Sequence, residues 1–83
     1  MTVKAYVLIG TRAGKTREVV EAIRNLRGVV SADAVTGPYD AIAIIVGESM
    51  NDIEEIIISK VQRVTGVSRT VICLAPSLES GQS

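Results

Sequence analysis

The sequence predicts an α+β domain with a ferredoxin-like βαββαβ order, in which a four-stranded antiparallel sheet carries two helices on one face. β-Branched residues dominate the chain, because Ile and Val supply 22 of its 83 residues, and such residues favour strands and buried sheet surfaces. The two halves are also alike, since residues 23–29 (IRNLRGV) align with residues 61–67 (VQRVTGV). A right-handed βαβ crossover in each half places both helices on the same face of the sheet.

Four apolar runs are the predicted strands. Residues 3–9 are apolar except for Lys4 and residues 41–46 are almost wholly apolar, while residues 29–36 and 67–74 return to strand character after a helical segment. Few polar side chains fall on either side of the first, third and fourth runs, so we expect these strands to be buried on both faces. The turn at residues 37–40 (GPYD) joins the second and third strands, which should therefore pair antiparallel.

Two helices are predicted from apolar residues that recur at helical spacing. The first spans residues 15–27, and the second begins at Ser49, Asn51 or Asp52, all of which are good N-cap residues. A glycine follows each helix, where a left-handed C-terminal cap is expected. The stripes consist of Val19, Ala22, Ile23 and Leu26 in the first helix and of Ile53, Ile56, Ile57, either Lys60 or Val61, and Val64 in the second.

These elements form one domain over residues 1–75, and the small, polar residues 76–83 are expected to be a flexible tail. Hydrophobic residues make up 47% of the chain and the mean hydropathy is +0.35. A domain of this size buries only about 60% of the surface of its unfolded chain, so one copy hides too little of this apolar surface. We expect a second copy to cover the bare sheet face, which gives a sheet-packed dimer of the dimeric α/β barrel type. The alternative is a slightly adhesive monomer.

The composition excludes several classes of function. Nine basic residues balance nine acidic ones, which gives no electrostatic reason to expect direct binding to nucleic acid or to a membrane surface. The chain has no histidine and a single cysteine, Cys73, so a Ser-His triad, an intramolecular disulfide and a His or Cys metal site are not expected. The sequence shows neither a signal-peptide pattern nor an apolar run of membrane-spanning length. We therefore expect a cytoplasmic protein without metal or cofactor.

Three local features have structural interpretations that we favour. Residues 10–16 (GTRAGKT) partly match a phosphate-binding loop, but three residues separate the glycines where the motif has four, so we interpret them as a turn into the first helix. Cys73 lies within an apolar run and is expected to be a small buried hydrophobic residue. On the fourth strand, Arg69 is interpreted as an intersubunit or solvated charge, whereas Thr70 is the better candidate for a hydrogen bond to a ligand.

The connection at residues 35–40 (VTGPYD) places a glycine, a proline, an aromatic ring and a carboxylate between two apolar strands. Loops of this kind commonly present binding groups. In the structural interpretation, Gly37 supplies an unusual backbone dihedral, Pro38 stiffens the turn and Asp40 accepts hydrogen bonds from nearby amides. The residues alone leave both interpretations open.

A set of motifs spread over residues 3–75 resembles the ligand-binding (RAM) domain of the Lrp/AsnC family, the feast/famine regulators. The set consists of Ala5-Tyr6-Val7-Leu8-Ile9, Gly14-Lys15, Val19, Gly28-Val29, Val35-Thr36-Gly37-Pro38-Tyr39-Asp40, Gly66-Val67 and Arg69-Thr70. In that family a helix-turn-helix domain precedes this one, whereas here the pattern begins almost at residue 1. The chain is therefore expected to be a stand-alone form of the domain.

The resemblance implies dimers formed through sheet packing, an octamer or similar ring of dimers, and an amino-acid effector bound at interfaces between dimers. Residues 37–40 match the family's effector loop, and residues 70–72 match its contribution from the fourth strand. Asp40 is then expected to pair with the effector's α-ammonium, while amides around Gly37 and the Thr70 hydroxyl take its α-carboxylate. The implied ligand-binding residues are Gly37, Pro38, Tyr39, Asp40, Thr70, Val71 and Ile72.

We therefore predict a non-enzymatic regulatory module that senses an amino acid, and the resemblance implies that it modulates transcription by co-assembly with full-length Lrp/AsnC relatives. Two alternatives remain. One is an oligomeric structural or assembly protein without a ligand, in which Tyr39 and Asp40 hold an interface. The other is a small cofactor-free α+β barrel enzyme, against which the lack of histidine and of other acid–base groups counts.

Overall fold

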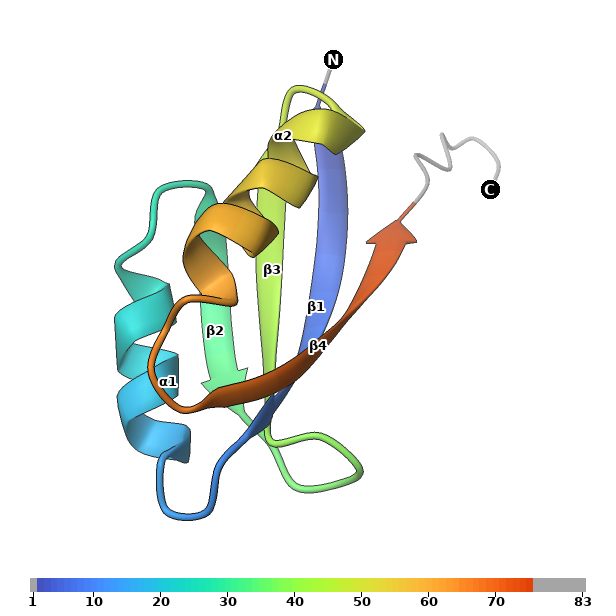
Figure 1. Cartoon of the computed structure of the whole chain (residues 1–83). Helices are drawn as coiled ribbons and strands as arrows, with labels where there is room; N and C mark the ends of the chain where they lie inside the picture. Colours follow the sequence, from blue (N-terminus) through green and yellow to red (C-terminus); the bar gives the residue numbers. More distant parts are fainter. Residues whose placement is uncertain (1, 76–83) are drawn as a thin grey trace.

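The computed structural model describes residues 2–75 as a four-stranded antiparallel sheet with helices on one face (Figure 1). The strand order in the sheet is β2-β3-β1-β4, which confirms the predicted ferredoxin-like α+β fold. The predicted tail, residues 76–83, lies outside the described residues. Along the chain the elements are β1 (Val3–Thr11), α1 (Thr16–Arg24), β2 (Val29–Ala34), β3 (Ala41–Gly47), α2 (Met50–Ile56), the π-helical segment η1 (Ile57–Val61) and β4 (Val67–Ala75).

Both helices lie close to their predicted positions. The Ser49 Oγ accepts a hydrogen bond from the Asp52 N–H at 3.2 Å, which identifies Ser49 as the N-cap of α2. Helix α1 ends before the predicted residue 27, because the N–H groups of Asn25 and Leu26 bond to carbonyls three residues back, at 3.3 and 3.0 Å. These bonds to the third residue back replace the α-helical bonds to the fourth, so the α-helix ends ahead of Gly28.

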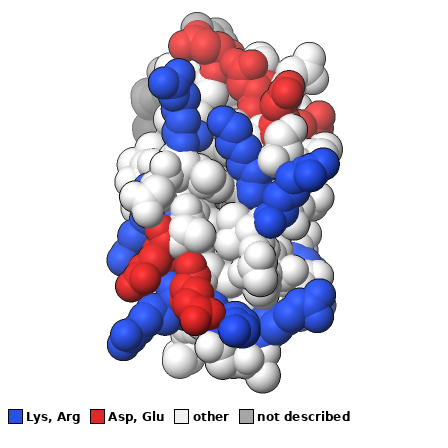
Figure 2. Space-filling model, turned by 60° about the vertical axis from the view of Figure 1, so that its left-hand side comes forward, with Lys and Arg blue, Asp and Glu red and all other residues white. Residues whose placement is uncertain are grey.

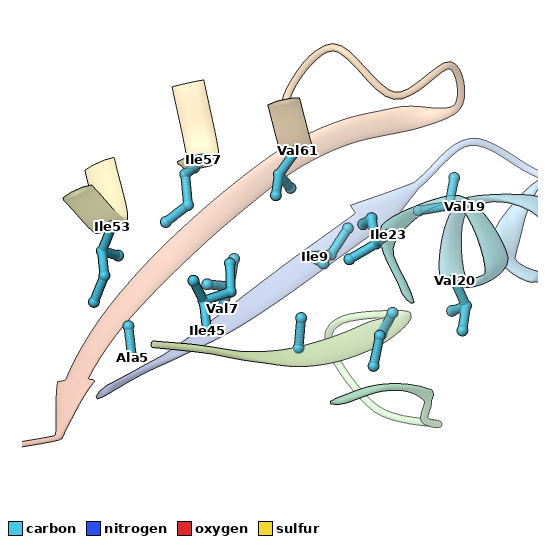
Figure 3. Packing of buried hydrophobic residues seen from close by; sticks show 13 residues of the cluster. Ala5, Val7, Ile9, Val19, Val20, Ile23, Ile45, Ile53, Ile57 and Val61 are labelled. Atoms are coloured by element: carbon cyan, nitrogen blue, oxygen red, sulfur yellow. The ribbon is translucent and has the colours of Figure 1, made fainter. Parts of the chain in front are cut away.

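The second helix changes its geometry halfway. Ile53, Ile57 and Val61 are all buried and lie four residues apart, on both sides of the junction between α2 and η1. In an α-helix, each step of four residues advances the side chain by about 40° around the axis. The wider π turn counters this drift, so all three side chains stay above the sheet (Figure 3).

The core lies between the helices and one face of the sheet (Figure 3). Alternate residues of β1 and β3 point into it, as expected for a pleated strand. Within residues 2–75, no polar or charged residue is buried. The fully covered sheet residues are Ala5, Val7 and Ile9 on β1 and Ala41, Ala43 and Ile45 on β3, and they pack against Val19, Val20, Ile23, Ile53, Ile57 and Val61.

No helix within residues 2–75 covers the other face of the sheet. Tyr6 pairs with Ile44 and Leu8 pairs with Ile42 on this face, and Tyr6 is 38% exposed while the other three are half-buried. The prediction of strands buried on both faces is thus wrong for the isolated chain, because both helices lie on the opposite face. We call this apolar surface the open face.

Strands β4 and β2 form the two edges of the sheet. On β4, Cys73 pairs with Tyr6 and is exposed, so the prediction of a buried cysteine is wrong for the isolated chain. Its side chain lies on the open face, and β4 is an edge strand with a neighbouring strand on one side only. On β2, the Arg24 Nε donates a hydrogen bond to the Ala32 carbonyl at 2.8 Å, and its guanidinium lies 3.6 Å from the Asp33 carboxylate. A side chain from α1 therefore occupies part of the β2 edge.

Both predicted glycine caps have left-handed backbones, with φ +93° at Gly28 and +102° at Gly66. A Cβ at Gly66 would lie 2.9 Å from the Val19 Cγ2 and 3.0 Å from the Lys15 Cβ, whereas Gly14, with φ +78°, has nothing within 4 Å. The two positions share the backbone strain but differ in available space.

We expect Gly66→Ala to lower the free energy of unfolding more than Gly14→Ala, as measured by urea denaturation. Gly14→Ala pays only the left-handed backbone cost of about 1–2 kcal/mol, while Gly66→Ala also forces Val19 of the core to move. Equal losses in the two variants would show that the packing around Gly66 yields without cost.

Candidate functional site

The connection between β2 and β3, residues 35–40, projects from the lower end of the sheet beside the end of β1 (Figure 1). Two backbone hydrogen bonds hold its base: the Val35 N–H donates to the Asp40 carbonyl at 3.0 Å, and the Asp40 N–H donates to the Ile9 carbonyl at 2.9 Å. Gly37 has φ +152°, which confirms that it supplies a dihedral rare in other residues. The loop is thus fixed at its base and exposed at residues 36–38.

The side chain of Asp40 already has a structural role. Its Oδ2 accepts a hydrogen bond from the Thr11 N–H at 2.8 Å, and the Thr11 hydroxyl is in turn 2.7 Å from that of Thr16 at the start of α1. This confirms the structural interpretation of Asp40. A carboxylate has acceptor sites on both oxygens, and Oδ1 makes no hydrogen bond within residues 2–75, so the group retains the capacity to accept from a ligand.

A pocket of about 280 Å³ lies beneath the loop, at the end of the open face. Two open-face residues form one side of it and five loop residues form the other, and its lining is almost wholly apolar. Two larger depressions, of about 700 and 490 Å³, lie elsewhere and contain none of the predicted site residues. The pocket under the loop is lined by Leu8, Val35, Thr36, Gly37, Pro38, Tyr39 and Ile42.

Arg69 reaches the loop from β4. Its guanidinium carbon lies 4.7 Å from the centroid of the Tyr39 ring, a cation–π distance. Arg69 pairs with Gly10 on β1, and a Cβ at Gly10 would lie only 3.0 Å from the Arg69 Cγ and 3.2 Å from its Nε. The Arg69 side chain therefore crosses β1 over Gly10, which has no side chain. Its contact with the Tyr39 ring links the loop to β4.

The structure divides the fourth-strand candidates between two faces. Val71 pairs with Leu8 and lies on the open face beside the pocket, whereas Thr70 and Ile72 alternate to the helix side of β4. The Thr70 hydroxyl accepts a hydrogen bond from the Gln62 Nε2 at 2.9 Å. Within one chain, Val71 thus shares the face of the pocket under residues 35–40, while Thr70 and Ile72 face away from it.

Sequence reasoning missed Arg69 as a member of this site, although the Arg69-Thr70 doublet itself was visible. The missing information is the strand register, which places Arg69 opposite Gly10 and on the same face as the pocket. Arg69 also forms no ion pair among the residues that the structure describes. It is a positive charge held next to an apolar pocket.

The surface carries clusters of both acidic and basic side chains. Figure 2 shows acidic side chains gathered at the upper end of one face, with basic groups below them and both signs at the lower end.

Over residues 2–75, no helix is long and apolar enough to cross a membrane, and no cluster of three or more His, Cys, Asp or Glu residues is arranged to hold a metal ion. The phosphate-loop-like segment forms a turn, in which the Arg12 N–H donates to the Gly66 carbonyl at 2.8 Å.

Known proteins that resemble this chain share its fold over most of its length. The crystal structure of TTHA0845 from Thermus thermophilus matches with a TM-score of 0.88 and 29% identity, covering 94% of this chain and 98% of that one. The hypothetical protein PHS023 from Pyrococcus horikoshii matches with a TM-score of 0.83 and 31% identity, covering 89% of each chain. The transcriptional regulator NMB0573 of Neisseria meningitidis, solved as an L-Met complex, has a TM-score of 0.79 at 20% identity, and the match covers 94% of this chain and 53% of the regulator.

A search of curated proteins found no match. The family model described as the Lrp/AsnC ligand binding domain matches residues 4–77, which is nearly the whole chain. The match spans the strands and helices of the βαββαβ fold almost completely. The chain therefore belongs to the Lrp/AsnC ligand-binding domain family.

Proposed function

We propose that this chain is a regulatory module that binds a free amino acid at the loop of residues 35–40 and that this binding stabilises its assembly. The observation that carries the proposal is the pocket under that loop, in a member of a ligand-binding domain family. The similar Neisseria regulator was solved with L-Met, which supports an amino acid as the class of ligand. We further propose that the module acts in the cytoplasm and regulates rather than catalyses.

Self-association through the open face is part of this proposal. Tyr6, Leu8, Ile42 and Ile44 form an apolar surface, with the Lys4 Nζ 5.2 Å from the Tyr6 ring centroid, that no helix within residues 2–75 covers, and such patches mark interaction sites. A second copy that presents the same surface gives a two-fold dimer. The family resemblance extends this to rings of dimers and to co-assembly with full-length relatives. A ligand that binds only the assembled form stabilises it by about 2.7 kcal/mol at a hundredfold excess over its Kd.

Asp40 and Gly37 keep their proposed roles toward the amino acid. The Asp40 Oδ1 is available to the α-ammonium group, and the backbone around Gly37 is exposed at the pocket. Thr70 and Ile72, which face the helix side, take part only where a neighbouring dimer covers that side of β4. The proposed site thus combines the loop and Val71 of one chain with groups from another copy.

A thermal-shift screen of the twenty amino acids tests the proposal. We expect one or a few of them to raise the Tm of the wild-type protein, by about 4–8 °C for each kcal/mol of binding energy, and Asp40→Asn to remove that rise. Asparagine retains a side-chain oxygen for the Thr11 N–H, which Asp40→Ala does not, so the folded loop is kept while the charge is lost.

Asp33→Asn is the matched control, because Asp33 lies on β2, does not line the pocket and pairs with Arg24. It should leave the amino-acid response unchanged. If no amino acid raises the Tm of an assembled wild-type protein, the proposal fails and the ligand-free assembly protein becomes the better description.

A further inference from the structure

We propose that the Arg69 guanidinium receives the carboxylate of the bound amino acid, and that the pocket beside it selects a small aliphatic side chain. This inference rests on the proposed function and adds to it a binding residue and a class of ligand. The residues that carry it are Arg69, Tyr39 and Gly10 on one side and the apolar lining of the pocket on the other.

The position of Arg69 is fixed on two sides. Its stem crosses Gly10 on the face that Leu8 shares, and its guanidinium rests on the ring of Tyr39. Both Leu8 and Tyr39 line the pocket, so the charge lies at the edge of that pocket. The planar guanidinium group offers a fork of N–H donors that suits a planar, bidentate partner such as a carboxylate.

The charge of Arg69 also has no ion-pair partner among the described residues. Within residues 2–75, Lys15 pairs with Glu18 and Arg24 pairs with Asp33, whereas Arg69 has no such partner. Thr70, the residue first considered for the carboxylate, faces the helix side and accepts a hydrogen bond from Gln62. Arg69 is therefore better placed than Thr70 to meet a carboxylate on the open face.

The pocket determines which side chain accompanies that carboxylate. Its volume is about 280 Å³, whereas sites for drug-sized ligands typically have volumes of about 300–1,000 Å³. A pocket of this size suits a molecule as small as one amino acid. No charged residue among residues 2–75 lines it, so a ligand with a charged side chain would lose its hydration without gaining a partner there. Leu8, Val35 and Ile42 instead offer apolar contact to an aliphatic side chain.

The test measures, by calorimetry, the Kd of L-leucine and of L-leucinamide, which lacks the carboxylate. We expect wild-type protein to bind leucine at least tenfold more tightly than leucinamide, and Arg69→Met to bring the ratio of the two Kd values close to one. Methionine keeps the length of the side chain and its contact with the Tyr39 ring but carries no charge. Because the ratio is taken within one variant, a change in folding or assembly that weakens both ligands alike leaves it unaltered.

Two further variants sharpen the test. Gly10→Ala leaves Arg69 in the chain but places a Cβ against its Cγ and Nε, and we expect it to lower the ratio as well. Arg63→Met removes an exposed arginine that does not line the pocket and should retain the wild-type ratio. A wild-type ratio in Arg69→Met would overturn the role of Arg69 and leave the proposed function standing.

The ligand class is tested with L-glutamate and L-lysine. We expect both to bind wild-type protein at least tenfold more weakly than L-leucine. Binding of either one as tight as that of leucine would overturn the assignment of the pocket to aliphatic side chains. If none of the twenty amino acids binds, the proposed function itself fails, and the role of Arg69 fails with it.

Discussion

Ile45→Ala is expected to lower the free energy of unfolding by about 2–5 kcal/mol, the usual cost of removing a buried isoleucine side chain. Ile45 is fully buried, and it pairs with Ala5 of β1 on the helix side of the sheet. Total stabilities of single domains are about 5–15 kcal/mol, so this one substitution removes a large part of the margin. Chemical denaturation, with both proteins at the same concentration, measures the difference.

Ile58→Ala is the matched control, because it is the same substitution at an isoleucine that is 60% exposed on η1. Exposed positions usually change stability by less than about 0.5 kcal/mol. A loss in Ile45→Ala no larger than this would contradict the assignment of the core to the helix side of the sheet, whereas a loss in Ile58→Ala as large as that in Ile45→Ala would bear on Ile58 alone. It would place Ile58 in a buried contact that a single chain does not show.

Ile44→Lys is expected to convert an assembled protein into monomers, as measured by sedimentation equilibrium. Ile44 lies at the centre of the open face, opposite Tyr6 on β1. In a sheet-packed dimer, the lysine would enter an apolar interface, where a charge without a partner costs several kcal/mol. In a monomer, the same lysine reaches water, and the fold survives.

Ile58→Lys introduces the same charge on the helix side and should leave the mass of the assembly unchanged. Retention of the wild-type mass by Ile44→Lys would show that the open face is not the dimer interface. A wild-type protein that is monomeric at micromolar concentration would contradict self-association altogether. Because Ile44 and Ile45 are neighbours on opposite faces, the two predictions separate fold stability from assembly.

The elements of the fold could be predicted because their apolar periods differ so clearly. Helical spacing in residues 15–27 and uninterrupted apolar runs at residues 41–46 leave little ambiguity of type, and the Gly-Pro pair of the turn identifies the hairpin. The π-helical turn of η1 left no such signal. It follows from the packing of Ile57 and Val61 on the sheet, which the pattern of apolar residues alone does not specify.

The candidate site was predicted only in part, because the sequence does not show the register in which β4 pairs with β1. The loop of residues 35–40 is recognisable from its own chemistry, but which of Arg69 and Thr70 faces it depends on how β4 pairs with β1. A shift of one residue exchanges the two faces of a strand. Cys73 was misjudged for a related reason, since an apolar run on an edge strand looks the same in sequence as one at the centre of a sheet.

The two edges of the sheet differ in how readily each can pair with a strand of another copy of this chain. β2 is six residues long, and Arg24 already occupies its Ala32 carbonyl, whereas β4 is nine residues long and apolar at Val71, Ile72 and Leu74. Among the described residues, β4 therefore offers the longer and more open edge to another strand. A pair of chains joined β4 to β4 would present outward only its two β2 edges, which are shorter and partly blocked by Arg24, so further strand addition toward a fibre is disfavoured.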